Sequence, residues 1–238
     1  MATYTLVPGA DGRAWFWHRL VPELQARGHR VITLDLPAEP DAGLDAFADA
    51  ICAAVVGGTG RPERADPLVL VAQSLAGFSV PVACERLPVP VSELVLLNAM
   101  VPAPGETAGQ WWENTGQAQA RSAYAEATGR GVAPEFDLRE DFFHDVPPEV
   151  TQEALSVGGS APPAALFEQP WPLPRWPDVP TRFLQGREDR FFPLEFQRRV
   201  VRERLGLEVE EIPGGHLAAL SRPRELADHL VRRAAGSA

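Results

Sequence analysis

The sequence predicts an α/β protein with a mostly parallel, doubly wound sheet of about six strands. Short runs rich in Val, Leu and Ile alternate along the chain with stretches of helical periodicity. The apolar runs are continuous rather than alternating, which is typical of parallel strands that helices cover on both faces. The 238 residues match the length of a single α/β domain, so one main core is expected.

Six apolar runs are predicted to be strands, and five periodic segments are predicted to be helices. The strands are expected at residues 4–7, 31–35, 68–73, 94–98, 181–185 and 209–212. The helices are expected at residues 14–26, 44–56, 75–87, 194–205 and 223–233. Because strands and helices alternate, the chain is expected to wind back and forth across both faces of one sheet.

An insertion interrupts this alternation between residues 99 and 178. It holds 11 of the 24 prolines and 4 of the 6 tryptophans, unlike the rest of the chain. We expect residues 1–98 and 179–238 to form the core, and residues 99–178 to form a helical cap over the carboxyl edge of the sheet, where such sheets bind ligands. The alternative is a plain helical excursion whose aromatic side chains only attach it to the core. The candidate substrate contacts in the insertion are Trp111, Trp112, Phe142, Phe143 and His144.

Charge and composition exclude several classes of function. The formal charge of −10 disfavours nucleic acid and anionic membranes as partners. All 22 basic residues are arginine, which excludes a lysine Schiff base and a Walker A phosphate loop. Cys52 and Cys84 lie within helical patterns, so reduced thiols are expected rather than a disulfide or a metal site. Without an apolar run of roughly 18 to 20 residues or a secretory leader, a cytoplasmic protein is expected.

Ser74 lies where the third predicted strand meets the following helix. Small residues, Ala72 and Ala76, stand two positions before and after it. This is the layout of a nucleophile elbow, in which a sharp turn exposes the serine and small neighbours let the backbone pass. The usual pattern has glycine at both flanking positions, so the motif is relaxed here. The alternative is that Ser74 is only a helix N-cap.

An elbow serine needs a base and an orienting acid, and both follow later strands. Asp189 lies in the charged loop after the fifth predicted strand, with Glu188 as the alternative acid and a solvated turn as the alternative without a function. His216 follows the sixth strand in a turn that contains Gly214 and Gly215. Ser74, Asp189 and His216 are therefore predicted to form a catalytic triad in which His216 is the base.

Acyl transfer also needs donors for an oxyanion, usually the backbone N–H after the nucleophile and one from the loop after an early strand. Leu75 and Ala10 fit these two positions, and Gly9 lets the second loop turn inward. Asp11 places a carboxylate beside this loop. It is interpreted either as part of a solvent-facing turn or as a contact for a polar or cationic part of the substrate.

The motifs, taken in order, resemble the α/β-hydrolase fold superfamily, and within it the group of plant methyl ester esterases and hydroxynitrile lyases with their bacterial relatives. The likeness covers nearly the whole chain. It is carried by residues 6–10, 15–17, 28–31, 34–37, 94–99, 141–145 and 216–223, which are similar to successive landmarks of the group. The resemblance implies an α/β-hydrolase fold with an inserted cap, and places Ser74, Asp189 and His216 at the triad positions.

The chain departs from the pattern of this group at Pro8, at Gln73 and at Asp11, which places the carboxylate beside the oxyanion loop. Pro8 replaces the usual histidine of the oxyanion loop, and Gln73 replaces the usual histidine before the nucleophile. Leu217 follows His216, where the hydroxynitrile lyases resemble one another in having a lysine. Since the chain has no lysine, cyanohydrin cleavage by their mechanism is disfavoured.

The resemblance implies a serine hydrolase that cleaves a small to medium carboxylic ester through an acyl-enzyme on Ser74, with no cofactor and no metal. Several alternatives stay open, because the same nucleophile and oxyanion donors serve other reactions. They are cofactor-free cleavage of C–C bonds, lyase, lactonase or cyclase-like chemistry, perhydrolysis, and a catalytically weak binder of small molecules. The expected partner is a small-molecule ester, and a homodimer is left open.

Overall fold

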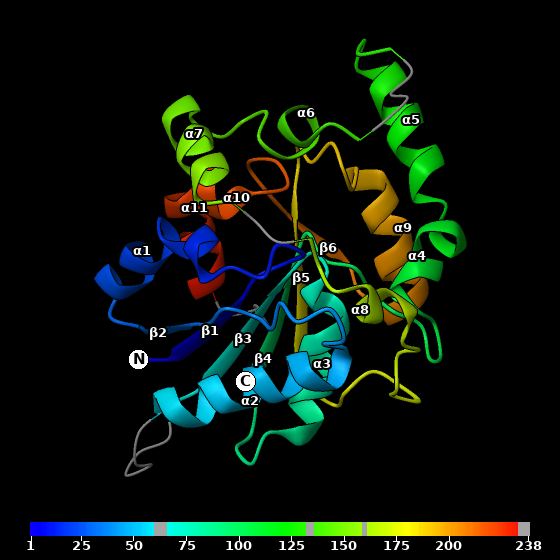
Figure 1. The fold of residues 1–238 in the computed structure, drawn as a ribbon. Helices are drawn as coiled ribbons and strands as arrows, with labels where there is room; N and C mark the ends of the chain where they lie inside the picture. The colour runs from blue at the N-terminus through cyan, green and yellow to red at the C-terminus, as the bar shows by residue number, and fades with distance from the viewer. Residues whose placement is uncertain (60–65, 132–135, 159–160, 233–238) are drawn as a thin grey trace.

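A six-stranded parallel sheet forms the centre of the molecule (Figure 1). The computed structural model describes residues 1–59, 66–131, 136–158 and 161–232. The strands follow the order β2-β1-β3-β4-β5-β6 across the sheet, and every neighbouring pair is parallel. They are β1 (Thr3–Val7), β2 (Arg30–Thr33), β3 (Leu68–Gln73), β4 (Glu93–Leu97), β5 (Thr181–Gly186) and β6 (Val209–Ile212). The predicted α/β class and parallel sheet are confirmed.

The strand order reverses at β1. From β1 the chain moves outward to β2, and it then crosses back to place β3 on the other side of β1. The loops that follow β1 and β3 therefore leave the sheet in opposite directions and open a crevice between them. Ala10 and Ser74 lie in these two loops, so the topology brings the predicted oxyanion loop and nucleophile together.

Helices cover both faces of the sheet (Figure 1). One face carries α1 (Leu20–Ala26) and α11 (Pro223–Val231), which contact each other. The other face carries α2 (Leu44–Thr59), α3 (Ala76–Arg86) and α9 (Leu194–Leu205). The prediction of one helix over residues 14–26 is wrong, because a short 3-10 helix, η1 (Ala14–Trp17), precedes α1. The His18 N–H bonds to the Trp15 carbonyl three residues back, which closes a 3-10 turn, and Trp17 packs into the sheet core while the two aromatic residues before it pack beside the site.

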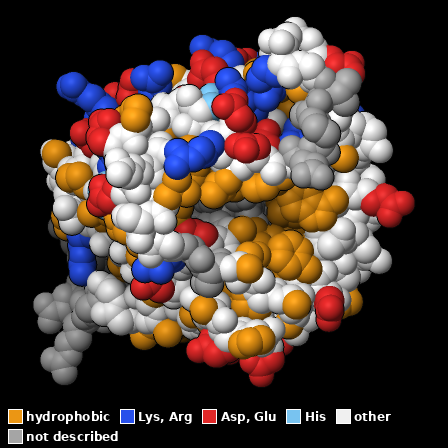
Figure 2. Space-filling model, turned by 45° about the horizontal axis from the view of Figure 1, so that its top comes forward, with side chains coloured by type: hydrophobic (Ala, Val, Ile, Leu, Met, Phe, Trp, Pro, Cys, Tyr) orange, Lys and Arg blue, Asp and Glu red, His pale blue; other side chains and the backbone are white. Residues whose placement is uncertain are grey.

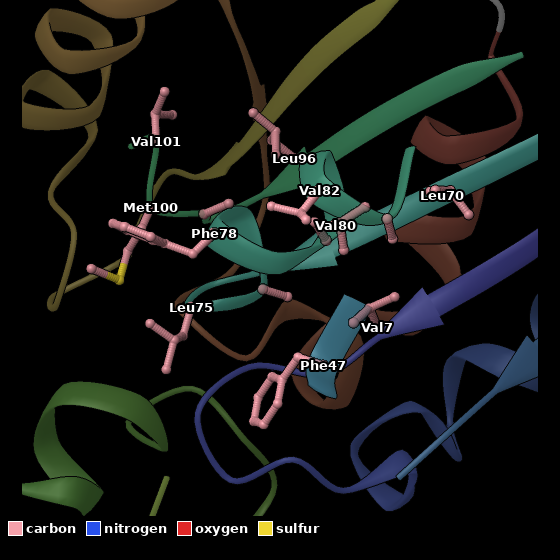
Figure 3. Close-up of a cluster of buried hydrophobic side chains, with 14 of the residues drawn as sticks. Val7, Phe47, Leu70, Leu75, Phe78, Val80, Val82, Leu96, Met100 and Val101 are labelled. Carbon is pink, nitrogen blue, oxygen red and sulfur yellow. The ribbon is translucent and has the colours of Figure 1, made fainter. Parts of the chain in front are cut away.

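The alternation of side chains along each strand divides the core into two layers. Leu70 and Leu96 point toward α2 and α3 and pack in one cluster with Phe47. Figure 3 shows this cluster, in which side chains from β1, β3, β4, α2 and α3 converge. Their neighbours along the strands, such as Val71, point toward α1 and α11. Both faces are buried, which explains the continuous apolar runs of the sequence.

The segment between β4 and β5 contains α4 (Ala108–Thr115), α5 (Gln117–Ala127), α6 (Leu138–Phe142), α7 (Pro148–Val157) and α8 (Ala164–Glu168). Figure 1 shows α6 and α7 above the carboxyl edge of the sheet, near α10 (Ala218–Ser221). Trp111 and Trp171 from the same segment belong to the sheet core, and the indole of Trp171 donates a hydrogen bond to the Phe78 carbonyl. One part of the segment thus packs into the core through Trp111 and Trp171. The part that contains α6 and α7 lies over the carboxyl edge of the sheet.

Two further observations concern the described part of the chain. None of its helices combines the length and apolar character needed to cross a lipid bilayer. Cys52 on α2 and Cys84 on α3 are free thiols. Burial raises the pKa of the Cys84 thiol to about 12, with a smaller contribution from Glu85, so this thiol stays protonated near neutral pH.

Candidate active site

Ser74 sits on a sharp turn between β3 and α3. Its φ of 53° lies in the left-handed region, which a residue with a side chain seldom adopts and which costs roughly 1–2 kcal/mol. The turn is held because the Ser74 carbonyl accepts hydrogen bonds from the N–H groups of Gly77 at 3.1 Å and Met100 at 3.0 Å. A strained serine supported in this way has the geometry of a nucleophile elbow.

A glycine that the relaxed motif retains explains how the turn packs. A Cβ at Gly77 would lie 1.9 Å from the Met100 carbonyl oxygen, closer than any real contact. Alanine replaces the usual glycine at positions 72 and 76, and both alanine side chains are buried in the core. The glycine that this elbow requires is therefore one residue later than the usual motif places it.

The predicted triad residues are connected by hydrogen bonds. Ser74 Oγ lies 3.1 Å from His216 Nε2, and His216 Nδ1 lies 2.9 Å from Asp189 Oδ2. All three residues are buried, with exposed fractions of 6%, 1% and 0% for Ser74, His216 and Asp189. Ser74 follows β3, Asp189 follows β5 and His216 follows β6. Because these strands are parallel, all three residues lie at the carboxyl edge of the sheet.

Asp189 rather than Glu188 contacts the histidine. Asp189 Oδ1 accepts the backbone N–H groups of Phe191 and Phe192, both at 2.9 Å, and Oδ2 also accepts from the Gln185 amide at 3.2 Å. These donors fix the position of the carboxylate beside His216. Glu188 is exposed, and its carboxylate instead accepts the backbone N–H of Gly214.

Asn98 ties together the loops that carry the acid and the base, a role that the sequence interpretation missed. Its Nδ2 donates to the carbonyls of Gly215 at 3.1 Å and His216 at 2.9 Å, and its Oδ1 accepts from the N–H of Gly186 at 2.7 Å. Asn98 has a φ of 46°, which asparagine tolerates better than most residues. An asparagine placed directly after an apolar strand was the signal available in the sequence.

Phenylalanine side chains surround the His216 imidazole. The Phe142 ring stacks on it, with 4.5 Å between ring centroids and 16° between the planes. The rings of Phe191 and Phe192 meet it edge-on at 5.3 and 5.2 Å. Such packing holds the ring plane in place and excludes water from its faces.

A cavity of about 410 Å³ opens above Ser74 and His216, with walls that are mostly apolar. Figure 2 shows the molecule from this side, with a hollow whose walls carry hydrophobic side chains. The lining comes from the loop after β1, from η1, from α6, α7 and α10, and from the residues that flank them. Of the residues singled out in the sequence, it includes Ser74, His216, Ala10, Asp11, Phe142, Phe143 and Leu217.

Three expected substrate contacts lie away from this cavity. Trp111 is fully buried in the sheet core, where its indole donates to the Val101 carbonyl and its ring meets Phe192 and Phe196. Trp112, half-buried, packs on the same aromatic group. His144 lies behind the loop of His216 instead of in front of it. The expectation that these side chains line the pocket is not met, because the aromatic excess of the insertion serves largely to attach it to the core.

The site has the organisation of a known family. The model of the alpha/beta hydrolase family matches residues 6–229. The chain belongs to the alpha/beta hydrolase family. A probable esterase, PIR7A, from Oryza sativa subsp. indica is 32% identical over 98% of this chain and 96% of its own length. An alpha-hydroxynitrile lyase from Arabidopsis thaliana is 24% identical over 95% of each chain. The crystal structure of polyneuridine aldehyde esterase has a similar fold, with a TM-score of 0.74 and 23% identity over 97% of this chain and 98% of that one. The protein is thus an enzyme of this family, as its sequence indicated.

One carboxylate lies in the lining of this hydrolase cavity. Burial raises the pKa of Asp11 to about 6, while the backbone N–H and the charge of Arg13 lower it and the charge of Asp35 raises it further. Asp11 Oδ1 accepts the Arg13 N–H at 3.3 Å, as in the turn expected from the sequence. The side chain nevertheless faces the cavity, so both interpretations of Asp11 describe part of its environment.

The described residues around the cavity offer few charged groups. Within residues 1–59, 66–131, 136–158 and 161–232, no three His, Cys, Asp or Glu side chains are grouped to hold a metal ion. None of the described residues that line the cavity is an arginine. Among the described lining residues, the side chains with polar atoms are those of Ser74, His216, Gln73, Asp11 and Trp17, and the surrounding backbone adds its own groups.

Proposed function

We propose that the protein hydrolyses small to medium, uncharged carboxylic esters through an acyl-enzyme on Ser74. The observation that carries the proposal is the unbroken contact from Ser74 Oγ to His216 Nε2 and from His216 Nδ1 to Asp189, at 3.1 and 2.9 Å, at the base of an apolar cavity. A hydroxyl with its base and orienting acid in this arrangement is the recurring solution for acyl transfer in water. The esterases among the relatives support the same chemistry.

In the first half of the reaction, Asp189 accepts the hydrogen bond from His216 Nδ1–H, which leaves the lone pair of Nε2 directed at Ser74. Nε2 takes the proton of Oγ as Oγ attacks the ester carbonyl carbon. The carbonyl oxygen becomes an oxyanion, and the backbone N–H groups of Ala10 and Leu75 are the expected donors to it. The bond to the alcohol oxygen then breaks, and the alcohol leaves with the proton held by His216.

In the second half, water replaces the alcohol. His216 takes a proton from this water while the water oxygen attacks the acyl carbon of the acyl-enzyme. The oxyanion forms again and is met by the expected N–H donors of Ala10 and Leu75. The bond from the acyl carbon to Ser74 Oγ breaks, and the serine recovers its proton from His216. The products are one carboxylic acid and one alcohol, and the enzyme returns to its starting protonation state.

The walls of the cavity indicate the class of ester. Phe142, Phe143 and Leu217 offer apolar contacts, and Asp11 is the carboxylate among the lining residues that the structure describes. An anionic substrate would meet this carboxylate with no arginine among the described lining residues to compensate it. Neutral acyl and alcohol groups, aliphatic or aromatic, are therefore favoured over groups that carry a carboxylate.

Lyase chemistry is the second function that the family contains, and the surroundings of His216 disfavour it. Cleavage of a cyanohydrin releases cyanide, whose charge a cation beside the base would stabilise. Leu217 occupies that place and lines the cavity, and the sequence has no lysine. Release of benzaldehyde from mandelonitrile is accordingly expected at the background rate, while neutral esters are hydrolysed.

The test combines covalent labelling with turnover. The wild-type protein should react with a fluorophosphonate at one serine and hydrolyse p-nitrophenyl esters, whereas Ser74→Ala should lose labelling and lower kcat by roughly 10⁴ to 10⁶. Ser79→Ala on the same helix removes a buried hydroxyl outside the site and is the matched control. Labelling with no turnover on any ester would favour a small-molecule binder. Unchanged turnover in Ser74→Ala would refute the proposal.

A further inference from the structure

His144 and Asp145 lie in the turn between α6 and α7, directly behind the loop that carries His216. Their side chains are nearly buried, with 9% and 12% of their surface exposed. Neither side chain lines the cavity, so neither can be assigned to substrate contact. Their position next to the base raises the question of what two buried polar side chains do there.

The two residues contact both loops that complete the triad. Asp145 Oδ2 accepts the backbone N–H of Gly215 at 2.8 Å, one residue before His216. The His144 ring also lies close to the backbone of Glu188, one residue before Asp189. One dipeptide thus binds the loop of the base and lies beside the loop of the acid.

Gly215 is shaped for this contact. A Cβ at Gly215 would lie 2.6 Å from His144 Nε2 and 2.8 Å from Asp145 Oδ1, so any other residue would displace these two side chains from their present positions. Its neighbour Gly214 has a φ of 101°. Two consecutive glycines give the His216 loop large conformational freedom, which contacts from outside the loop must restrict. Asn98 restricts it through two carbonyls, and Asp145 through an N–H on the same stretch.

The pair is not arranged for the greatest stability. His144 Nε2 and Asp145 Oδ1 are 4.0 Å apart, and each is buried without a hydrogen-bond partner among the described residues. Buried polar atoms without a partner destabilise a protein, and natural structures retain few of them. Asp145 therefore makes a bond to the backbone of the catalytic loop instead of a closer pair with the histidine beside it. Such an arrangement is expected where position matters more than stability.

We propose that His144 and Asp145 are a positioning pair that fixes the Gly214–Gly215 turn and so holds His216 Nε2 at Ser74. The pair also links the base to Phe142 and Phe143 of the cavity wall. These two phenylalanines lie at the end of α6, directly before His144 and Asp145 in the chain. Loss of the Asp145 acceptor is expected to act on kcat and not on substrate binding. The proposal rests on the proposed esterase function only for its readout.

The experiment compares two substitutions of nearly equal size. Asp145→Leu removes the acceptor for the Gly215 N–H, whereas Asp145→Asn keeps an oxygen that can accept it. A displacement of the base by about 1 Å is enough to cost on the order of 100-fold. We therefore expect Asp145→Leu to lower kcat for a p-nitrophenyl ester by roughly 10- to 100-fold, with KM within about twofold of wild type. Asp145→Asn should recover most of this loss.

Thr151→Val is the matched control, because Thr151 lies buried on α7, lines no part of the cavity and loses a hydrogen bond to a backbone carbonyl. It should lower Tm without lowering kcat. The rate of fluorophosphonate labelling is measured in the same preparations, since labelling also needs His216 to activate Ser74. If Asp145→Leu does not fold, Gly215→Ala provides the second test, because its Cβ would displace the pair directly.

Three results would overturn the proposal: wild-type kcat in folded Asp145→Leu, a raised KM at constant kcat, or an Asp145→Asn variant as slow as Asp145→Leu. Failure of the esterase function itself looks different. In that case the wild-type protein would hydrolyse none of the esters, with or without labelling, before any variant of Asp145 is compared.

Discussion

Asp11 should decide how the enzyme treats charged esters, and Asp11→Asn tests this with little change of shape. The new amide can still accept the Arg13 N–H that the carboxylate accepts at 3.3 Å. A sphere with the 410 Å³ volume of the cavity is about 9 Å across, so a charge on a bound ester lies within about 9 Å of Asp11. At that distance two unit charges interact by about 1.8 kcal/mol at an effective dielectric constant of about 20, or about 20-fold in kcat/KM.

The assay compares p-nitrophenyl heptanoate with the mono-p-nitrophenyl ester of adipic acid, whose acyl chain ends in a carboxylate. At pH 8 the wild-type enzyme should prefer the neutral ester by about 20-fold more than Asp11→Asn does. Because the pKa of Asp11 is about 6, the extra preference should fade as the pH falls from 7 to 5. The ratio of two substrates cancels the loss of activity caused by protonation of the base.

The same pKa has a consequence for stability. A carboxyl whose pKa is raised on folding from 3.8 to about 6 binds protons more tightly in the folded state. Its contribution is most favourable below pH 3.8 and is lost as the pH rises through 6. The cost above that pH is about 3 kcal/mol at most. Asp11→Asn should therefore raise the free energy of unfolding in urea at pH 8, and much less at pH 4. An unchanged substrate ratio together with unchanged stability at pH 8 would show that Asp11 faces solvent.

Four further substitutions test other parts of the molecule. Asp189→Asn should lower kcat by about 10⁴ and Glu188→Gln by less than about tenfold, and the opposite ranking in steady-state kinetics would exchange their roles. Gly77→Ala should lower the free energy of unfolding by about 3 kcal/mol, since its Cβ would meet the Met100 carbonyl at 1.9 Å; a stable variant in urea titration would contradict the fit of the elbow. Trp111→Ala should lower the free energy of unfolding by about 3–5 kcal/mol and leave the ranking of neutral esters unchanged. An altered ranking would show that Trp111 contacts the substrate.

The core of the fold and the three residues of the hydrogen-bonded chain could be predicted from the sequence. The bounds expected for β3 and β6 agree with the structure. β3 is buried on both faces and is therefore apolar almost throughout. β6 is an edge strand that carries Glu210 and Glu211 between Val209 and Ile212. Polar residues that directly follow such strands are brought to one edge by the parallel topology alone. Ser74, Asp189 and His216 were visible for this reason, and Asp189 is the acid that contacts His216.

The position of the insertion could be predicted from its composition. Which of its side chains face the cavity could not be predicted. Trp111 and Phe142 are both aromatic residues in short helices, yet one fills the core and the other stacks on His216. Helices of this length show too little periodicity to reveal which side faces inward. Asn98 was missed for another reason: its role depends on three backbone groups from loops far along the chain, which no local pattern encodes.

Ser74 and His216 are 142 positions apart in the sequence, and they meet only across the assembled sheet. A chain synthesised as far as α9 would contain the proposed nucleophile and acid but lack the proposed base, so it should be inert toward esters while it is still growing. During refolding, bringing such distant segments together is a slow step, because chain closure over long separations is entropically unfavourable. The return of ester hydrolysis after dilution from urea should thus lag behind the return of helical circular dichroism. The recovery of ester hydrolysis therefore reports when the last strands of the sheet have joined it.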